Sequence, residues 1–252
     1  MTAAPRSGPT DSPNLAADRV LQVLSGFLTS SEPMGVMEIS RRLGLDKSVV
    51  HRILTTLTLH GYLDQDTSSR KYRVGLTAWE LGQRFTARSW VADVAVPLLD
   101  KLLRRFGSSG YVGSLDGAEI VYLATVDGPG PFQVWVEVGS RASALTTALG
   151  RAILAELPSD ELERVVAAAG PQVDRGRLDG ELAAARSRGY AINRGESRPG
   201  VGSVGAAIKD SKSRIVGAIS VAFPIMPEFD SMWEILPAEI MKVADEISRQ
   251  VG

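Results

Sequence analysis

Residues 47–55 carry side chains whose types and spacing suit contact with DNA bases. Asp46 is a good helix N-cap, and the apolar residues after it recur at the spacing of one buried helix face: Val50, Ile53, Leu54 and Leu57. The opposite face holds Lys47, Ser48, Val49, His51, Arg52 and Thr55. Hydrogen-bonding side chains near the N-terminus of an exposed helix face are suited to reading base edges in the major groove. The pattern therefore predicts a DNA-reading helix.

A second short helix is expected just before it, over Val36–Leu43. Its apolar residues at 36, 39 and 43 form one stripe, whereas Arg41 and Arg42 stay exposed. Gly44 then ends the helix. Two short helices joined by a tight turn predict a helix-turn-helix, although any small helical hairpin can show the same spacing.

The segment that follows predicts a short β-hairpin, which favours the DNA-binding interpretation. Residues 62–63 and 70–74 flank the polar turn at 66–69. The side chains expected to pack inward are Leu63, Tyr72 and Val74. Arg70 and Lys71 lie at the tip. A helix-turn-helix followed by a hairpin with a basic tip is a winged helix-turn-helix.

Basic charge is concentrated in this part of the chain. Between Ser40 and Arg73 there are seven Lys or Arg and three Asp, whereas the whole 252-residue chain has a net charge of −1. Such a footprint is typical of phosphate binding. We expect contacts to base edges from Lys47, Ser48, Val49 and His51. Contacts to phosphates or the adjacent minor groove are expected from Arg52, Arg41, Arg42, Arg70 and Lys71.

The larger, C-terminal part of the chain lacks the residues on which much enzyme chemistry depends. The sequence contains no Cys, and both histidines, His51 and His60, lie in the predicted DNA-binding segment. Ser-His-Asp hydrolysis, histidine-ligated zinc and thiol chemistry are therefore excluded from residues 61–252. We predict no catalytic residue, no metal and no cofactor. The rival interpretation is an enzyme with a DNA-binding appendage that uses carboxylates and lysines.

Nothing in the sequence predicts a membrane segment. No uninterrupted apolar stretch approaches the roughly 18 residues that would span a bilayer, and the N-terminus lacks a charged start followed by an apolar core. We expect a cytoplasmic protein with no membrane partner.

The chain is expected to consist of four parts. Residues 1–13 hold three prolines among Ser, Thr and Gly, and are predicted to be a disordered tail. The winged helix-turn-helix domain is assigned to 14–75 and begins with a helix over about Leu15–Leu28. A linker helix is assigned to 76–90, and a larger domain to 91–252.

The linker helix carries two apolar faces. One face holds Ala78, Leu81 and Phe85, and another holds Leu76 and Trp79. Two apolar faces need two partners. We expect one face to lie on the DNA-binding domain and the other to meet the same helix of a second subunit.

From residue 91 onward the pattern alternates between helices and short strands. The predicted helices are Val94–Arg105, Leu145–Leu157, Leu178–Arg188 and Trp233–Gln250, with Pro97 placed in the first turn of its helix. The predicted strands are Gly110–Leu115, Glu119–Val126, Phe132–Val138, Tyr190–Arg194, Gly200–Lys209 and Arg214–Phe223. A sheet of antiparallel strands covered by helices is an α+β domain, which can enclose a pocket.

A glycine-rich stretch, residues 200–205, is one candidate for a ligand site. A dinucleotide-binding turn should open a helix, whereas these glycines lead into a hairpin, so the nucleotide interpretation is disfavoured. Glycines let backbone amides approach a bound carboxylate, and Ser203 adds a hydroxyl. A bulge or tight turn explains the same glycines without any ligand.

A second candidate is the run Thr146-Thr147-Ala148-Leu149-Gly150-Arg151, which begins a predicted helix. The free amides and the dipole at a helix N-terminus attract anions. An ordinary N-cap at Thr146 or Thr147 explains the same residues.

Together these features resemble the IclR family of bacterial transcriptional regulators from about Leu15 onward. The matching segments in the first domain are Leu43–Leu54, Gly61-Tyr62, Tyr72–Gly75 and Leu81-Gly82. In the second domain they are Gly139-Ser140-Arg141, Ala148–Ala155, Arg188-Gly189-Tyr190 and Val216–Val221. The resemblance implies a winged helix-turn-helix, a linker helix used in dimerisation, and a C-terminal effector domain related to the GAF fold.

The resemblance also implies which residues bind the effector. Ligand contacts of family members fall on Ala148, Leu149, Asn193, Ser203 and Ser220 of this chain. Three departures stand out: many members have Cys at the position of Ser203, an acid at Asn193 and Pro at Ala207. The loss of the acid is expected to make the pocket less hostile to anions.

The expected function is that of a ligand-responsive transcriptional regulator. A dimer or tetramer would place recognition helices in successive major grooves of a partly palindromic operator, with half-sites about 10 base pairs or a multiple apart. A small organic acid or aromatic catabolite in the C-terminal domain would alter the affinity for DNA. A further alternative is an architectural DNA binder that keeps the second domain only for oligomerisation.

Overall fold

A computed structural model describes residues 14–30, 32–86 and 90–251, so the predicted tail at 1–13 lies outside the described residues. The chain divides into two compact units, Met1–Arg88 and Ser89–Gly252. The division falls within the range assigned to the linker helix. The predicted class is confirmed: the fold is α+β, with an N-terminal winged helix-turn-helix and an antiparallel sheet in the C-terminal unit.

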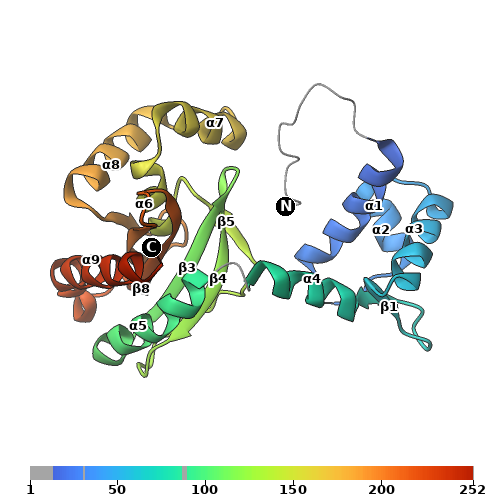
Figure 1. Cartoon of the computed structure of the whole chain (residues 1–252), viewed down its shortest axis with the longest axis horizontal. Coiled ribbons are helices and arrows are strands. Elements are labelled where there is room, and N and C mark those ends of the chain that lie inside the picture. The colour runs from blue at the N-terminus through green and yellow to red at the C-terminus, as the bar shows by residue number, and fades with distance from the viewer. Residues whose placement is uncertain (1–13, 31, 87–89, 252) are drawn as a thin grey trace. The chain divides into compact units, whose positions relative to one another are not determined.

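The first unit is a small helical domain with a two-stranded hairpin (Figure 1). Its helices are α1 Leu15–Ser25, the 3-10 turn η1 Gly26–Thr29, α2 Val36–Leu43, α3 Lys47–Leu59 and α4 Leu76–Thr86, and its strands are β1 Leu63–Gln65 and β2 Tyr72–Val74. The core comes from the apolar stripes of α1, α2 and α3, where Val23, Val50 and Leu54 are fully buried. Gly44 ends α2 as predicted, because its φ of 65° is in the left-handed region.

The hairpin departs from prediction at one residue. Leu63 and Tyr72 are buried as expected, and Tyr72 forms an extra β-bridge with Met34. Val74, however, is 51% exposed. The chain turns at Gly75, which lies so close to the backbone of Gly61 that a Cβ would be 2.4 Å from the Gly61 carbonyl oxygen.

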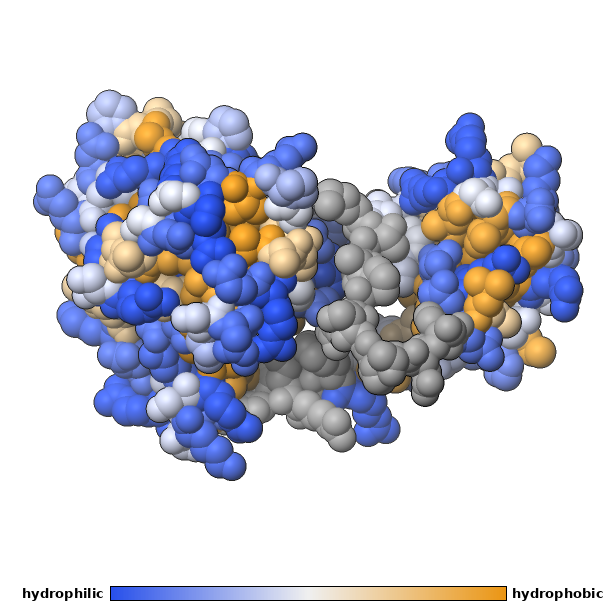
Figure 2. Space-filling view, turned by 90° about the horizontal axis from the view of Figure 1, so that it is seen from above, coloured by the Kyte–Doolittle hydropathy of each residue, from blue (hydrophilic) through white to orange (hydrophobic). Residues whose placement is uncertain are grey.

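Helix α4 leaves apolar side chains exposed on both of its faces. Leu76 and Trp79 on one face are exposed, and so is Leu81 on the other. Hydrophobic surface is also visible elsewhere on this unit in Figure 2. Helix α4 meets the rest of its unit mainly at its first residues, near Gly61 and Gly75.

The second unit is built on a six-stranded sheet of order β5-β4-β3-β8-β7-β6, in which all neighbours are antiparallel. The strands are β3 Ser109–Asp116, β4 Glu119–Asp127, β5 Arg141–Ser143, β6 Ala191–Arg194, β7 Val201–Lys209 and β8 Ile215–Pro224. The helices are α5 Trp90–Phe106, α6 Ala148–Glu156, α7 Ser159–Ala169, α8 Arg175–Arg188, η2 Pro227–Phe229 and α9 Met232–Gln250.

Helices cover both faces of this sheet, as Figure 1 shows. Helices α5 and α9 pack on one face, and α6, α7 and α8 pack on the other. The strands alternate between the two cores: Val112 of β3 belongs to the first, whereas its neighbour Tyr111 belongs to the second. The second core adjoins the functional cavity described below.

Several element predictions need correction. Residues 132–138 form no strand; they are irregular, and the edge strand is instead β5, which pairs with β4. The apolar alternation of this segment arises because Val134 and Val136 pack against the second core. Helix α7 was not predicted. Helix α5 starts at Trp90 rather than Val94, so Pro97 lies inside the helix and not in its first turn. No described helix is long and apolar enough to cross a membrane.

Candidate DNA-binding surface and effector cavity

The outer face of α3 presents free polar and basic groups. Lys47, Ser48, His51 and Arg52 are exposed, and the side chains of Lys47, His51 and Arg52 have no hydrogen-bonding or ionic partner among the described residues. Asp46 occupies the N-cap position, but its side chain makes no capping hydrogen bond, contrary to expectation. The face therefore offers donors and positive charge to an external partner, as base and phosphate recognition requires.

Two of the predicted DNA contacts are partly engaged within the first unit. Val49 is half-buried and packs on the core, because it lies one turn before Ile53 on the same side of α3. The Arg42 guanidinium lies 3.5 Å from the Gly26 carbonyl oxygen and 3.9 Å from the Glu38 carboxylate, and so braces α2 against η1. Arg41, in contrast, is exposed and has no partner in the described part of the chain.

An aspartate organises the tip of the wing. Asp66 Oδ1 accepts hydrogen bonds from the backbone amides and the hydroxyls of Ser68 and Ser69, at distances of 2.6 to 3.1 Å. The hydroxyl of Ser68 and the groups of Ser69 hold the Asp66 pKa far below its usual range. Next to this turn Arg70 has a φ of 59°, and its carbonyl accepts from Gln65. The exposed side chains of Arg70 and Lys71 thus project from an ordered tip.

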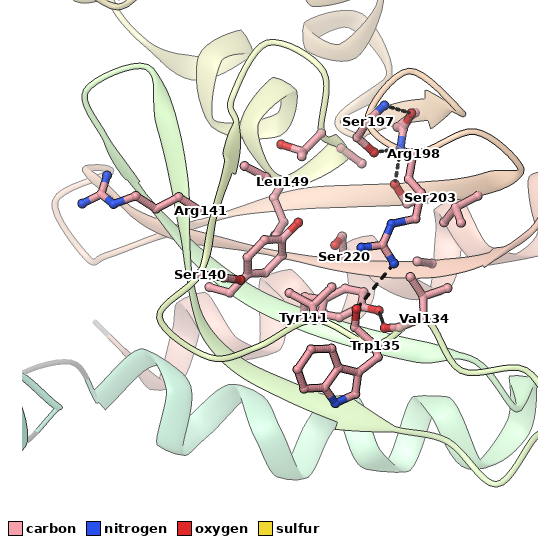
Figure 3. A pocket seen from close by; sticks show the side chains of 18 of the residues that line it. Tyr111, Val134, Trp135, Ser140, Arg141, Leu149, Ser197, Arg198, Ser203 and Ser220 are labelled. Atoms are coloured by element: carbon pink, nitrogen blue, oxygen red, sulfur yellow. Dashed lines mark hydrogen bonds between the residues drawn. The ribbon is translucent and has the colours of Figure 1, made fainter. Parts of the chain in front are cut away.

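The second unit contains a cavity of about 360 Å³ (Figure 3). Its walls come from β3, β4, β5, β6, β7 and β8, from the start of α6, and from irregular residues within 134–140 and 197–198. All five residues predicted to contact a ligand line it: Ala148, Leu149, Asn193, Ser203 and Ser220. The two sequence candidates, the start of a helix and the glycine-rich stretch, therefore meet at one site.

The start of α6 supplies backbone donors. Thr147 is its N-cap: the hydroxyl accepts from the Gly150 amide at 3.1 Å and donates to the Ser143 carbonyl at 3.0 Å. Over the described residues, the amides of Ala148 and Leu149 find no acceptor. Gly205 lets this helix end approach β7, because a Cβ there would lie 2.7 Å from the Ala148 carbonyl oxygen. The N-cap and anion-site interpretations of this run are thus compatible.

The glycines of β7 serve packing rather than ligand binding. A Cβ on Gly202 would lie 2.5 Å from the ring of Trp233, and Gly205 makes room for α6. The backbone of β7 pairs with β6 on one side and β8 on the other, so its amides do not reach toward a ligand as proposed from the sequence. Only the Ser203 side chain of this stretch, 7% exposed, belongs to the polar wall.

Asn193 is the most highly connected polar side chain of the cavity. Its Oδ1 accepts from the amides of Gly195, Glu196 and Ser197 at 3.0, 2.8 and 3.3 Å. Its Nδ2 donates to the hydroxyl of Ser197 at 2.6 Å and to that of Ser203 at 3.3 Å. The side chain is 1% exposed and has no spare donor or acceptor direction in this network. It organises the wall rather than offering free atoms.

Two tyrosines form an aromatic wall. The rings of Tyr111 and Tyr122 meet edge to face with centroids 5.6 Å apart, and the Tyr111 hydroxyl donates to the Val134 carbonyl. Burial raises the pKa of both phenols, an effect that the nearby charge of Arg198 partly opposes. Both therefore stay protonated at neutral pH. Sequence reasoning missed them because the strands β3 and β4 showed only their apolar alternation.

Two arginines line the cavity, but only one is free of carboxylates. Arg141 donates to Asp116 at 2.7 Å and to Glu119 at 3.2 Å. Arg198 reaches across the cavity to the Trp135 carbonyl at 3.5 Å, as Figure 3 shows, and pairs with no carboxylate of the described chain. Sequence reasoning missed Arg198, because it stands in a short polar loop with no helical or strand periodicity.

A buried ion pair fixes the loop that carries Ser197 and Arg198. Arg151, on α6, donates to Glu196 and to the Ile192 carbonyl, each at 2.9 Å. Arg151 is 4% exposed as a residue, whereas Arg177, which donates to the same Glu196 oxygen at 3.1 Å, is exposed. Burial alone raises the pKa of Glu196, but the hydrogen bond and charge of Arg151 together with the backbone amides of Glu196 and Arg194 outweigh it, and the net shift of the pKa is downward.

The described residues contain no group of three or more His, Asp or Glu side chains placed to hold a metal ion. The walls of the cavity present hydrogen-bonding groups, charged side chains and aromatic rings.

Comparison with known proteins points to one family along nearly the whole chain. The model for the IclR helix-turn-helix domain matches residues 16–67, and the model for the C-terminal domain of bacterial transcriptional regulator IclR matches residues 83–249. The chain is 31% identical over 214 residues to the HTH-type transcriptional regulator XynR of Escherichia coli K12. That match covers 82% of this chain and 85% of XynR.

Solved structures share the fold. An IclR family transcriptional regulator from Brucella abortus is 25% identical and superposes with a TM-score of 0.80, covering 98% of this chain and 97% of that one. An IclR homologue from Microbacterium hydrocarbonoxydans, solved with 4-hydroxybenzoate, is 22% identical with a TM-score of 0.81, covering 94% of this chain and 98% of that one. At this identity the second likeness concerns the fold alone.

Proposed function

Since this chain belongs to the IclR family of bacterial transcriptional regulators, we propose that an ionised organic acid controls its affinity for a partly palindromic operator. The protein is a DNA-binding regulator with a C-terminal effector domain and is not an enzyme. The observation that carries the proposal is the cavity, whose wall holds the Arg198 guanidinium, which pairs with no carboxylate of the described residues, and the free amides at the start of α6.

The DNA contacts are assigned to the free groups of the first unit. Lys47, Ser48 and His51 are proposed to contact base edges, and half-buried Val49 contributes at most part of its apolar surface. The proposed phosphate or minor-groove contacts are Arg41, Arg52, Arg70 and Lys71. Arg42, which the sequence also predicts to contact phosphates, is left out of this group because its guanidinium contacts η1 and Glu38.

The spacing of the operator half-sites depends on how two copies of the chain are related in an oligomer. Two recognition helices related by a twofold axis would enter successive major grooves, so half-site centres are proposed to lie about 10 base pairs or a multiple apart. The exposed apolar side chains Leu76, Trp79 and Leu81 of α4 support a second copy of the chain as the partner. A dimer or a dimer of dimers satisfies both requirements.

The effector is proposed to be a small organic acid or an aromatic catabolite with a carboxylate. The start of α6 and Arg198 would hold the charged group, and the rings of Tyr111 and Tyr122 would pack on an aromatic or apolar body. A volume of about 360 Å³ is in the range of small-molecule sites. The 4-hydroxybenzoate bound to the Microbacterium homologue supports an acid of this size.

An operator titration with and without ligand tests the proposal. The DNA fragment is first selected from random sequence by the protein, and its affinity is then measured by fluorescence anisotropy in a series of aliphatic and aromatic carboxylates. A coupling of about 1–3 kcal/mol, or roughly 5- to 150-fold in operator affinity, is expected for the cognate class. Specific DNA binding that no carboxylate changes, together with no ligand binding by calorimetry, would favour an architectural DNA binder instead.

A further inference from the structure

The backbone of Asp46, the residue before α3, is held on both sides. Before it, the Leu45 amide donates to the Ser40 carbonyl at 3.2 Å, and the Ser40 hydroxyl donates to the Leu45 carbonyl at 2.6 Å. After it, the Val50 amide donates to the Asp46 carbonyl at 3.0 Å. The point from which the Asp46 side chain projects is therefore fixed by the turn and by the first turn of the helix.

The carboxylate of Asp46, in contrast, is not used within the unit. It is exposed, makes no capping hydrogen bond and has no ionic partner among the described residues. An aspartate at the N-cap ordinarily stabilises its helix by accepting from the first backbone amides. Since Asp46 makes no such bond, its charge and both of its oxygens stay available to an external partner.

The two other acids of the basic segment 40–73 are engaged within the fold. Asp66 accepts hydrogen bonds from the turn of the wing. Asp64 lies 3.9 Å from the Arg73 guanidinium. Within this segment, all of which the structure describes, Asp46 is the one acid whose carboxylate has no partner.

A free carboxylate on a DNA-binding face has few favourable partners in a duplex. It repels the phosphates and the acceptor atoms of the bases. Its favourable partners are amino groups in the major groove, and the N4 amino group of cytosine is the usual contact of Asp and Glu. The first residues of a recognition helix are the ones that reach base edges. Asp46 lies at this end of α3.

The next residue, Lys47, suits the other half of the same base pair. A C·G pair presents the cytosine N4 donor beside the guanine O6 and N7 acceptors, and Lys is a common contact of those acceptors. Lys47 is exposed, and no ion pair joins it to Asp46 in the described chain. An acceptor and a donor therefore stand side by side, in the combination that a C·G edge requires.

We infer that Asp46 is a specificity-determining residue, which accepts from the N4 amino group of a cytosine in each operator half-site and weakens binding to other DNA by repelling phosphates. This inference rests on the proposed function, because it requires α3 to lie in the major groove. It adds the base that one residue selects and the sign of its effect on non-specific binding.

A carboxylate in this role affects specific and non-specific binding in opposite directions. Its removal costs the contact with cytosine and so weakens operator binding. The same removal relieves a repulsion and so strengthens binding to unrelated duplex, where phosphate contacts supply the affinity. An acid needed only for the folding of α3 would shift both affinities in the same direction.

The decisive variant is Asp46→Ser. Serine is as good an N-cap as aspartate, so the helix is kept. Its hydroxyl is uncharged and both donates and accepts, so it does not select one base. The matched control is Asp64→Ser, which removes the same charge from an exposed position on β1 of the same unit. The control should leave the base preference unchanged.

Each full-chain protein first selects duplexes from random sequence, and affinities are then measured by fluorescence anisotropy at one salt concentration. Sites selected by the wild type should contain a C·G pair in each half-site that Asp46→Ser does not require. Replacing this pair by T·A should weaken wild-type binding about tenfold and weaken Asp46→Ser binding less than about twofold. Unrelated duplex should bind Asp46→Ser about two- to fivefold more tightly than it binds the wild type.

A modified base tests the contact at the level of one hydrogen. Methylation of cytosine at N4 keeps the base pair but replaces the N–H that faces the major groove. At the selected position it should weaken wild-type binding about tenfold and leave Asp46→Ser binding within about twofold. Equal losses in the two proteins would contradict the contact with Asp46.

Other results would also overturn the inference. They are identical base preferences in the wild type and Asp46→Ser, a requirement for a base other than cytosine that residue 46 controls, and operator and unrelated duplex affinities that fall together. If thermal unfolding shows that Asp46→Ser does not fold, Asp46→Asn decides, because Asn is also a good N-cap. Its preferred base should change from cytosine to adenine, the usual contact of Asn, and an unchanged base would overturn the inference.

Failure of the proposed function gives a distinguishable result. A selected operator whose affinity responds to no carboxylate would overturn the proposed regulation but leave the reading of cytosine intact. A selected operator that the wild type and Asp46→Ser read alike would overturn only the inference. A wild type that enriches no sequence at all would overturn both.

Discussion

The proposed recognition face of α3 and the wall of the proposed effector cavity present their hydrogen-bond donors in different ways. On α3 the groups point outward, and Lys47, His51 and Arg52 have no partner in the described chain. In the cavity, Asn193 donates to the hydroxyls of Ser197 and Ser203, and Asn193 is itself held by a loop that Arg151 and Glu196 brace. Each side chain on the surface of α3 is therefore independent of the others, whereas the polar side chains of the cavity wall depend on one another through hydrogen bonds.

This difference predicts which substitutions should weaken DNA binding and which should destabilise the fold. Changes on α3 should remove DNA contacts while leaving the fold intact, because exposed side chains contribute little to folding. Changes behind the cavity wall should cost stability first, because they leave buried charges or polar groups without partners.

The largest effect is expected at the buried ion pair. Arg151→Met leaves the Glu196 carboxylate without its principal buried partner and should lower the free energy of unfolding of the second unit by about 3–5 kcal/mol. Arg177→Met removes an exposed partner of the same carboxylate and should cost about 1 kcal/mol or less. Chemical denaturation of both variants measures the contrast. Equal losses would show that burial does not distinguish the two arginines.

The next effect concerns the DNA-reading face. Replacing both His51 and Arg52 by Ala should weaken operator binding by about 2–4 kcal/mol, since each good base or phosphate contact contributes on this scale. The thermal midpoint should stay unchanged, because both side chains are exposed. Arg104→Ala, which removes an exposed arginine from the second unit, is the matched control and should leave operator affinity unaltered. Retained affinity in the double variant would contradict the assignment of α3.

A smaller effect should separate two adjacent arginines. Arg41→Ala is expected to weaken DNA binding by about 1 kcal/mol and to reduce the slope of log K against log salt by about 1, as loss of one phosphate contact does. Arg42→Ala should act mainly on stability, because its guanidinium braces α2 against η1. Anisotropy at several salt concentrations, combined with thermal unfolding, tests the pair. A salt slope changed only by Arg42→Ala would reverse the assignment.

The smallest effect is at the wing. The hydrogen bonds from Ser68 and Ser69 lower the pKa of Asp66 in the folded protein, so their contribution is present above the unfolded pKa of about 3.9 and is lost only as pH falls through the lower folded value. A carboxyl NMR titration should therefore show Asp66 ionised throughout the pH range above 4. In a Ser68→Ala, Ser69→Ala variant the Asp66 pKa should move back up, and an unmoved value would show that other groups hold it.

The sequence was most informative where structure is local. The bounds of α2, Val36–Leu43, and the buried face of α3 were predicted correctly, because one amphipathic stripe and a glycine in the left-handed region determine them. Asp46 shows a limit even here: its position at the N-cap was right, but its side chain makes no capping bond. Sequence alone does not say which oxygen a side chain turns toward an amide.

The cavity was predicted in part, by resemblance and by the two anion-attracting motifs. Ala148, Leu149, Asn193, Ser203 and Ser220 do line it. The part of the wall at 134–137 escaped prediction, because the apolar alternation of Phe132–Val138 predicts a strand that the structure does not contain. Alternating apolar residues indicate that one side of a segment is buried. A segment that lines a cavity is buried on one side just as a strand of a sheet is, so the pattern does not distinguish the two. The contacts of Arg198 with Trp135 span 63 positions in sequence, a separation at which periodicity carries no information.

The glycines around α6 set limits for anyone who wishes to retune this regulator as a biosensor. A Cβ on Gly150 would lie 2.2 Å from the Ala144 carbonyl oxygen, and one on Gly205 would meet the Ala148 carbonyl, so the floor of the cavity has no spare room for mutation. Tyr122, Arg198 and the irregular residues 134–137 also line the cavity. Libraries for new effectors should therefore diversify these positions and leave the glycines unchanged.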